Sequence, residues 1–119
     1  RGECRVPEVR DVLTARNTGH DGGWATIHAN GARDVPARLA ALGALAGMGE
    51  GAVAAQAASA IDAVLHMRRG ADGHRWVSEV GVLTRARGPL ECALALSATA
   101  DGCVTTHEAW PSLARRVGL

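Results

Sequence analysis

Residues 17–34 read Asn-Thr-Gly-His-Asp-Gly-Gly-Trp-Ala-Thr-Ile-His-Ala-Asn-Gly-Ala-Arg-Asp, and the fold is decided by the segment at their centre, Trp24 to His28. Trp, Thr and Ile suit a pleated, half-buried surface, so this segment predicts a short β-strand. The glycine and asparagine residues on both sides of it provide the turn chemistry that separates a strand from its neighbours. We therefore expect one strand between two loops, with other elements before and after it.

Helices are expected on both sides of this strand. Before it, Pro7 and the acidic residues that follow suit the first turn of a helix. After it, apolar residues from Val35 to Leu45 recur at helical spacing, and Gly47 follows them as a stop signal. A third, alanine-rich helix is predicted from about Ala52 to Ala60.

The pattern then changes to the alternation of a β-hairpin. Apolar and polar residues alternate from Ile61 to Met67, and Gly70-Ala71-Asp72-Gly73 provides a turn. The return strand is expected from Arg75 to Thr84, and alternation resumes from Leu90 to Leu96. These segments predict that the sheet ends in antiparallel strands.

The order of elements indicates an α/β fold, with helices packed on a sheet. A parallel sheet usually contains several strands, and only Trp24 to His28 is a candidate parallel strand before the hairpin. The missing strands are expected before Arg1, so the domain at residues 1–97 is expected to be incomplete. Residues 98–119 show no clear period and predict an irregular C-terminal tail.

Composition excludes several classes of protein. The chain has 119 residues, 47% of them hydrophobic, which suits one compact domain or a piece of a larger one. Its net charge of +1 comes from dispersed residues, so we expect no nucleic acid partner. Three cysteines without CxxC spacing predict neither a disulfide framework nor a zinc site, which suits a reducing, cytoplasmic compartment. The apolar stretches are interrupted by polar residues, and no membrane insertion is expected.

Two motifs carry a resemblance to a known family. Gly2-Glu3-Cys4-Arg5 resembles the end of a Walker B motif, Gly-Glu-x-Arg, and residues 18–30 resemble a histidine box, Thr-Gly-His-x-Gly followed by Thr-x-His-Ala. Both are similar to the secretion and pilus-assembly ATPases of type II and type IV systems, closest to the tight-adherence pilus branch. The similarity continues to about Thr84, with the motifs in the order and spacing of that family. It implies the C-terminal part of a RecA-like P-loop ATPase core.

The resemblance implies catalytic roles for four residues. Glu3 would position water and the outer-sphere ligands of Mg²⁺, and Arg5 would pair with phosphate or with an acid across a subunit boundary. His20 and His28 would donate hydrogen bonds near the γ-phosphate. Without the resemblance, each of them would be an ordinary solvated acid, surface arginine or polar histidine.

Three further residues of the histidine box are implied to lie around the nucleotide: Thr18, Gly19 and Thr26. The glycines of the box also suit a simple turn, and that alternative remains open. A zinc site on His20 and His28 is disfavoured because the chain has no HExxH pattern there. No protein-bound metal is therefore expected, apart from Mg²⁺ near Glu3.

One part of an ATPase is missing from this sequence. A P-loop, GxxxxGK[ST], needs a lysine, and the chain contains none. The parent family is expected to use ATP and Mg²⁺, to form a homo-hexamer and to work with inner-membrane pilus or secretion platform proteins. The isolated chain is expected neither to bind nucleotide tightly nor to hydrolyse it.

Two other classes of function remain open. A non-catalytic fragment or interaction module would bind a full-length ATPase ring without dependence on nucleotide. A metal-dependent hydrolase built on His20 and His28 would lose its activity to chelators.

Overall fold

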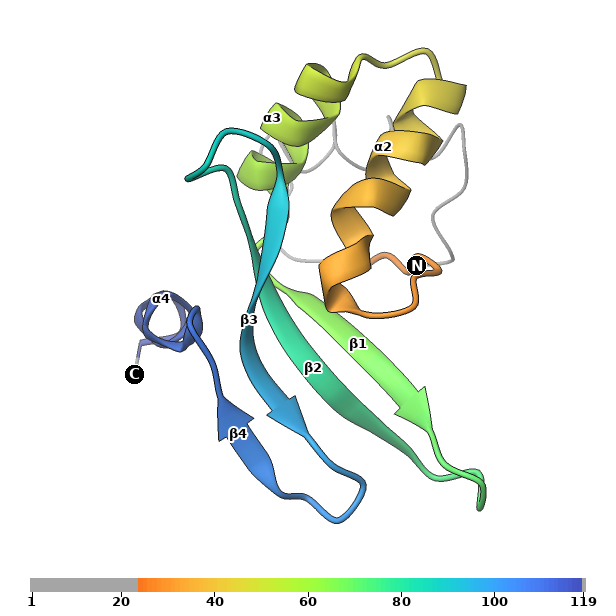
Figure 1. Ribbon diagram of the computed structural model, residues 1–119, viewed down its shortest axis with the longest axis vertical. Coiled ribbons are helices and arrows are strands. Elements are labelled where there is room, and N and C mark those ends of the chain that lie inside the picture. The colour runs from red at the N-terminus through yellow and green to blue at the C-terminus, as the bar shows by residue number, and fades with distance from the viewer. Residues whose placement is uncertain (1–23, 119) are drawn as a thin grey trace.

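The computed structural model describes residues 24–118, which form a four-stranded sheet with helices packed on it (Figure 1). This mixed α/β architecture is the expected fold class. The elements in chain order are η1 (Ala32–Asp34), α2 (Val35–Leu45), α3 (Glu50–Ala60), β1 (Val64–Arg69), β2 (Arg75–Thr84), β3 (Glu91–Ala98), β4 (Val104–Thr106) and α4 (Trp110–Arg116).

The sheet has the order β1-β2-β3-β4, and all three neighbouring pairs are antiparallel. The predicted hairpin and its return strand are therefore confirmed. Its turn is closed by the hydrogen bond from Gly73 N to Gly70 O at 3.0 Å, and Gly73 has φ of 87°, which side chains with a Cβ rarely adopt. The register shifts at Ser78, because Glu79 pairs with His66 and Val77 with Met67. Ser78 is left out of the backbone pairing, although its Oγ donates to His66 O at 3.1 Å.

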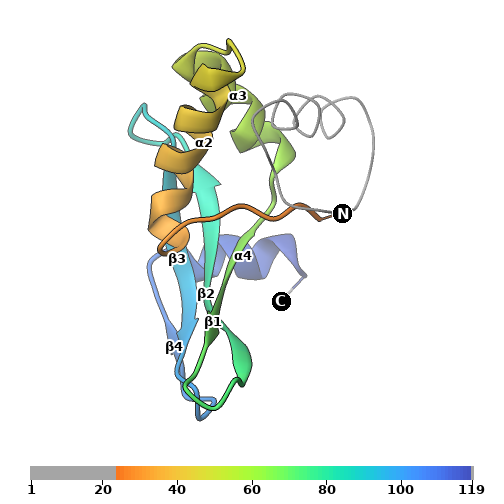
Figure 2. The same ribbon diagram turned by 90° about the vertical axis from the view of Figure 1, so that its right-hand side faces the viewer.

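Helices cover both faces of the sheet, because successive side chains of a strand point to opposite sides. Leu83 and Leu94 belong to the larger core cluster, which they share with residues of α2 and α3. Val82 and Ala95, their neighbours in sequence, pack instead with Ala109 and Leu113 beside α4. Figures 1 and 2 show α2 and α3 at one end of the sheet, with the β1–β2 and β3–β4 turns at the opposite end.

Helix α2 follows the sequence prediction. Pro36 stands in its first turn, Leu39 and Leu42 are buried, and the chain leaves the helix at Gly47 with φ of 81°. Leu45 lies at the end of the same apolar stripe but is 72% exposed, because the last turn extends beyond the core. The predicted alanine-rich helix corresponds to α3.

The prediction of a strand from Trp24 to His28 was wrong. Only Thr26 forms a β-bridge, and the other residues of the segment belong to no strand. Trp24 is 70% exposed, so the apolar packing that makes Trp favourable in strands is missing here.

The expectation of an irregular tail at residues 98–119 was also wrong. Strand β4 pairs with β3, and α4 buries Leu113 against the sheet. These elements have three and seven residues, which is too short for a periodic pattern to be recognised in the sequence. Pro111 in the first turn of α4 is a helix-start signal that the sequence does contain.

Helices α2 and α3 pack closely because Gly43 has no side chain. A Cβ atom at Gly43 would lie 2.3 Å from Val53 Cγ2, and Val53 is 1% exposed. A β-branched side chain buried in this way has little freedom to move aside.

We predict that Gly43→Ala lowers the free energy of unfolding by about 1–2 kcal/mol. Overpacking costs about 1–3 kcal/mol, and alanine returns up to about 1 kcal/mol of helix propensity. Urea denaturation followed by circular dichroism measures the change. Gly51→Ala is the control, because nothing lies within 4 Å of its added Cβ, and it should be neutral or stabilising. Equal effects of the two substitutions would contradict the packing argument.

Candidate functional site

Two of the seven residues assigned to the nucleotide site by the resemblance lie in the described part of the chain. Thr26 and His28 are both exposed, whereas Ile27 and Ala29 between and after them pack against the larger core cluster. The two polar side chains therefore share the side of the segment that faces away from the core. The other five, Glu3, Arg5, Thr18, Gly19 and His20, lie outside the described residues.

The segment that carries His28 is fixed to the sheet by an acid that the sequence analysis did not single out. Glu79 Oε1, on β2, accepts a hydrogen bond from Ala32 N at 2.8 Å, and Ala32 is fully buried. This carboxylate takes one of the backbone N–H groups that the start of a helical turn leaves without a partner. The sequence signal for this role was a single acid, Glu79, within a mainly apolar strand.

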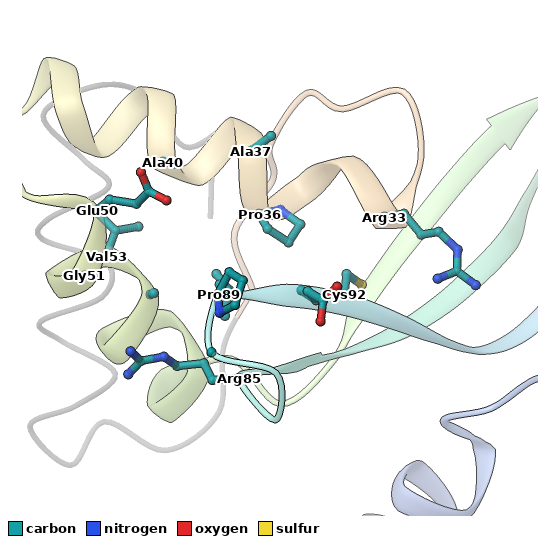
Figure 3. Close-up of a pocket in the computed structure, with 14 residues that line it drawn as sticks. Arg33, Pro36, Ala37, Ala40, Glu50, Gly51, Val53, Arg85, Pro89 and Cys92 are labelled. Atoms are coloured by element: carbon teal, nitrogen blue, oxygen red, sulfur yellow. The ribbon is translucent and has the colours of Figure 1, made fainter.

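An open pocket of about 570 Å³ lies between α2, the start of α3 and the β2–β3 loop (Figure 3). Its charged lining residues are two arginines, Arg33 and Arg85, and two acids, Glu50 and Glu91, so neither sign of charge dominates. Thr26 and His28 do not line it. Neither of the two described residues of the expected nucleotide site therefore contributes to this pocket.

Cys92 lines this pocket but is not a reactive thiol. It is 3% exposed, and burial raises its pKa to about 11, although the Arg33 guanidinium opposes that rise. A thiol with such a pKa is almost wholly protonated near neutral pH, whereas nucleophilic cysteines are thiolates. Cys92 consequently acts as a small core residue.

Ser97 and His107 form a hydrogen-bonded pair, with Ser97 Oγ 2.7 Å from His107 Nε2. Within residues 24–118 no carboxylate is hydrogen-bonded to the His107 ring, so the arrangement lacks the third group that orients a catalytic histidine. His107 N also donates to Ala95 O at 2.9 Å. The pair therefore ties the segment before α4 to β3, a role that the sequence analysis missed because no motif marks it.

The described residues offer no ready metal centre. Between residues 24 and 118 there is no group of three or more His, Cys, Asp or Glu side chains that could hold a metal ion. Nor is any helix in this range long and apolar enough to cross a membrane. The chain also has no lysine, so its own side chains do not fit a complete ATP site of the P-loop kind.

Comparison with known proteins decides the family. A family described as "Type II/IV secretion system protein" matches residues 1–115. The chain belongs to this family. The match includes both sequence motifs and continues through β4 and most of α4.

Two curated relatives come from strains of Mycobacterium tuberculosis, CDC 1551 and H37Rv. Each is provisionally named a conjugal transfer protein and is 47% identical to this secretion-family chain over 90 residues. The aligned region covers 76% of this chain but 26% of each relative. The chain therefore spans about a quarter of the length of these relatives.

We predict that Glu79→Ala lowers the free energy of unfolding by about 1–3 kcal/mol, because it leaves the buried Ala32 N–H without its acceptor. Glu79→Gln should cost less, since an amide oxygen can still accept the bond. Urea denaturation measures both changes. Glu91→Ala is the control, because it removes only an ion pair at 3.9 Å from Arg87, worth about 0–1 kcal/mol. A Glu79→Ala effect no larger than this control would refute the anchoring role.

We also predict that Cys92 resists alkylation by iodoacetamide at pH 8, whereas the exposed Cys103 reacts. The folded pKa of Cys92 is raised, so its thiolate forms only as the pH approaches about 11. Burial of the neutral Cys92 thiol therefore contributes fully to stability at pH values below its pKa in the unfolded chain. That contribution is lost as the pH rises through its pKa in the folded chain. Peptide mass spectrometry measures the labelling, and urea should make both thiols reactive. Rapid labelling of native Cys92 at pH 8 would contradict its burial.

Proposed function

We propose that this chain is the C-terminal part of an ATPase that couples ATP hydrolysis to pilus assembly or protein secretion, in the tight-adherence branch of the family. The observation that supports the proposal most is the family match over residues 1–115, which includes the Gly-Glu-x-Arg motif and the whole histidine box. The relatives' provisional name, conjugal transfer protein, is consistent with a role in a transfer or secretion system.

In this proposal the described end of the histidine box, residues 24–30, is held in place by the sheet. Thr26 and His28 are exposed, while Ile27 and Ala29 pack against the larger core cluster, so both polar side chains lie at the surface of the molecule. The Glu79–Ala32 hydrogen bond fixes the chain four residues after His28. A neutral or charged imidazole in that position can donate a hydrogen bond to an anion.

The remaining roles come from residues outside the described part. Glu3 is proposed to orient the attacking water, with Arg5, His20, Thr18 and Gly19 near the phosphates. Mg²⁺, when bound, neutralises charge on the phosphates. The P-loop lysine has no counterpart in these 119 residues. The loop that cradles the phosphates is therefore proposed to lie in residues beyond them.

The proposal extends to the assembly and its surroundings. We infer a cytoplasmic homo-hexamer that works against inner-membrane platform proteins, in which nucleotide-driven movements of the subunits move the partner.

The experiment replaces the aligned region of the H37Rv relative with the corresponding residues of this chain and measures ATP hydrolysis. The relative and the chimera should both hydrolyse ATP, and the isolated 119-residue chain should not. His28→Ala in the chimera should lower kcat by at least about tenfold, as expected for a hydrogen-bond donor or proton-transfer group near the reacting phosphate.

His66→Ala is the matched control, because His66 lies on β1, outside the box, and should leave kcat within about twofold. A relative without ATPase activity, or equal losses for the two histidine variants, would refute the proposal. Hydrolysis by the isolated chain would also refute the assignment of phosphate binding to residues beyond it. An inactive chimera that still binds the intact relative would favour the interaction module instead.

A further inference from the structure

The tip of the β1–β2 hairpin gathers positive charge. Arg68, Arg69 and Arg75 flank the Gly70–Gly73 turn, and all three are exposed. Figure 1 shows this end of the hairpin projecting away from α2 and α3. We call these three arginines, with His74 and Trp76, the arginine tip.

The described part of the chain does not neutralise the arginine tip. Within residues 24–118, Arg33, Arg87 and Arg116 form ion pairs, whereas Arg68, Arg69 and Arg75 form none. A guanidinium presents five N–H donors in a planar fork, and here three such forks are left to solvent.

Two acids lie on the turns at this end of the sheet, and both are engaged locally. Asp72 Oδ1 accepts a hydrogen bond from His74 N at 2.9 Å, which holds the tip turn. Asp101, on the β3–β4 turn, accepts from Thr99 Oγ1 and from Cys103 N. These bonds close the two turns, so neither carboxylate is committed to an arginine.

The register of the hairpin places two of these charges directly opposite each other. Arg69 pairs with Arg75 across the strands, and like charges in that arrangement destabilise a sheet. Arg68 pairs with Trp76 and lies on the other face, because neighbouring residues of a strand alternate. The hairpin therefore presents arginine on both faces and keeps a repulsive pair that its own fold does not need.

The aromatic residues make the arginine tip rigid. The rings of His74 and Trp76 are stacked, with centroids 6.2 Å apart and an interplanar angle of 11°. Trp76 Nε1 donates to Ala98 O at 3.0 Å, which ties the hairpin to the end of β3. A charged surface whose backbone is already ordered loses less conformational entropy when it binds.

From these observations we propose that the arginine tip is a docking surface for an acidic segment of a protein partner. Carboxylates fit the planar forks of arginine in a bidentate manner, and arginine and tryptophan are the residues most often found at the energetic centre of interfaces. The docking would remove the Arg69–Arg75 repulsion, which adds to its driving force. It does not depend on the nucleotide site.

The size and shape of the surface favour a protein over other anions. Nucleic acid binding draws its strength from many phosphate contacts, and three arginines in a chain of net charge +1 provide few. Attachment to an anionic membrane needs an apolar group that enters the lipid, and the turn itself, Gly70-Ala71-Asp72-Gly73, contains an acid and no large apolar residue.

The test measures fluorescence anisotropy of a labelled oligoglutamate peptide titrated with the 119-residue chain at low salt. Arg69→Gln/Arg75→Gln should weaken binding by about fivefold or more, while leaving the midpoint of urea unfolding unchanged or higher because the repulsion is gone. The matched control, Arg38→Gln/Arg115→Gln, removes two exposed arginines elsewhere that form no ion pair within residues 24–118, and it should weaken binding by less than about twofold.

Three results would overturn the proposal. The wild-type chain could fail to bind oligoglutamate, or both double variants could weaken binding equally, which would indicate net charge alone. Oligothymidylate of the same charge, or phosphatidylglycerol vesicles, could bind more tightly than oligoglutamate, which would assign the surface to nucleic acid or to a membrane. Preference for oligoglutamate together with the selective loss supports the proposal.

Discussion

Strand β2 is the element on which the rest of the described structure depends. It is hydrogen-bonded to β1 on one side and to β3 on the other, and its alternating side chains serve both helical layers. Leu83 faces α2 and α3, Val82 faces α4, and Glu79 holds the start of η1. One strand thus sets the position of the helices, of the segment that carries Thr26 and His28, and of the arginine tip.

Local patterns predicted most of this arrangement correctly. The helical spacing from Val35 to Leu42 and the alternation on both sides of the Gly70–Gly73 turn identified α2, β1 and β2. These signals depend on residues close together in the sequence, and each element is long enough to show its period. Predictions failed at Trp24–His28, where a strand depends on a distant neighbour, and at β4 and α4, where the elements are too short.

The candidate site could be predicted only as far as its motifs reach. Thr26 and His28 were recognised because their residue types and order match a family pattern. Glu79 and the Ser97–His107 pair act through contacts between positions that no short motif connects. The exposure of Arg68, Arg69 and Arg75, and their lack of ion pairs within the described residues, likewise follow from tertiary placement, whereas the sequence shows only an even balance of charge.

The β-bulge at Ser78 affects how this hairpin can change in length. Residues 66 and 68 share a face of β1, so their partners Glu79 and Trp76 share a face too, although they are three positions apart on β2. In a regular strand, residues three positions apart lie on opposite faces, and the bulge at Ser78 brings these two onto the same face. Loss of the extra residue would therefore leave both side chains on one face, whereas a further insertion between Trp76 and Glu79 would separate their faces unless it formed a second bulge. In an alignment of relatives, a difference of one residue in this strand is therefore expected as the presence or absence of the Ser78 bulge.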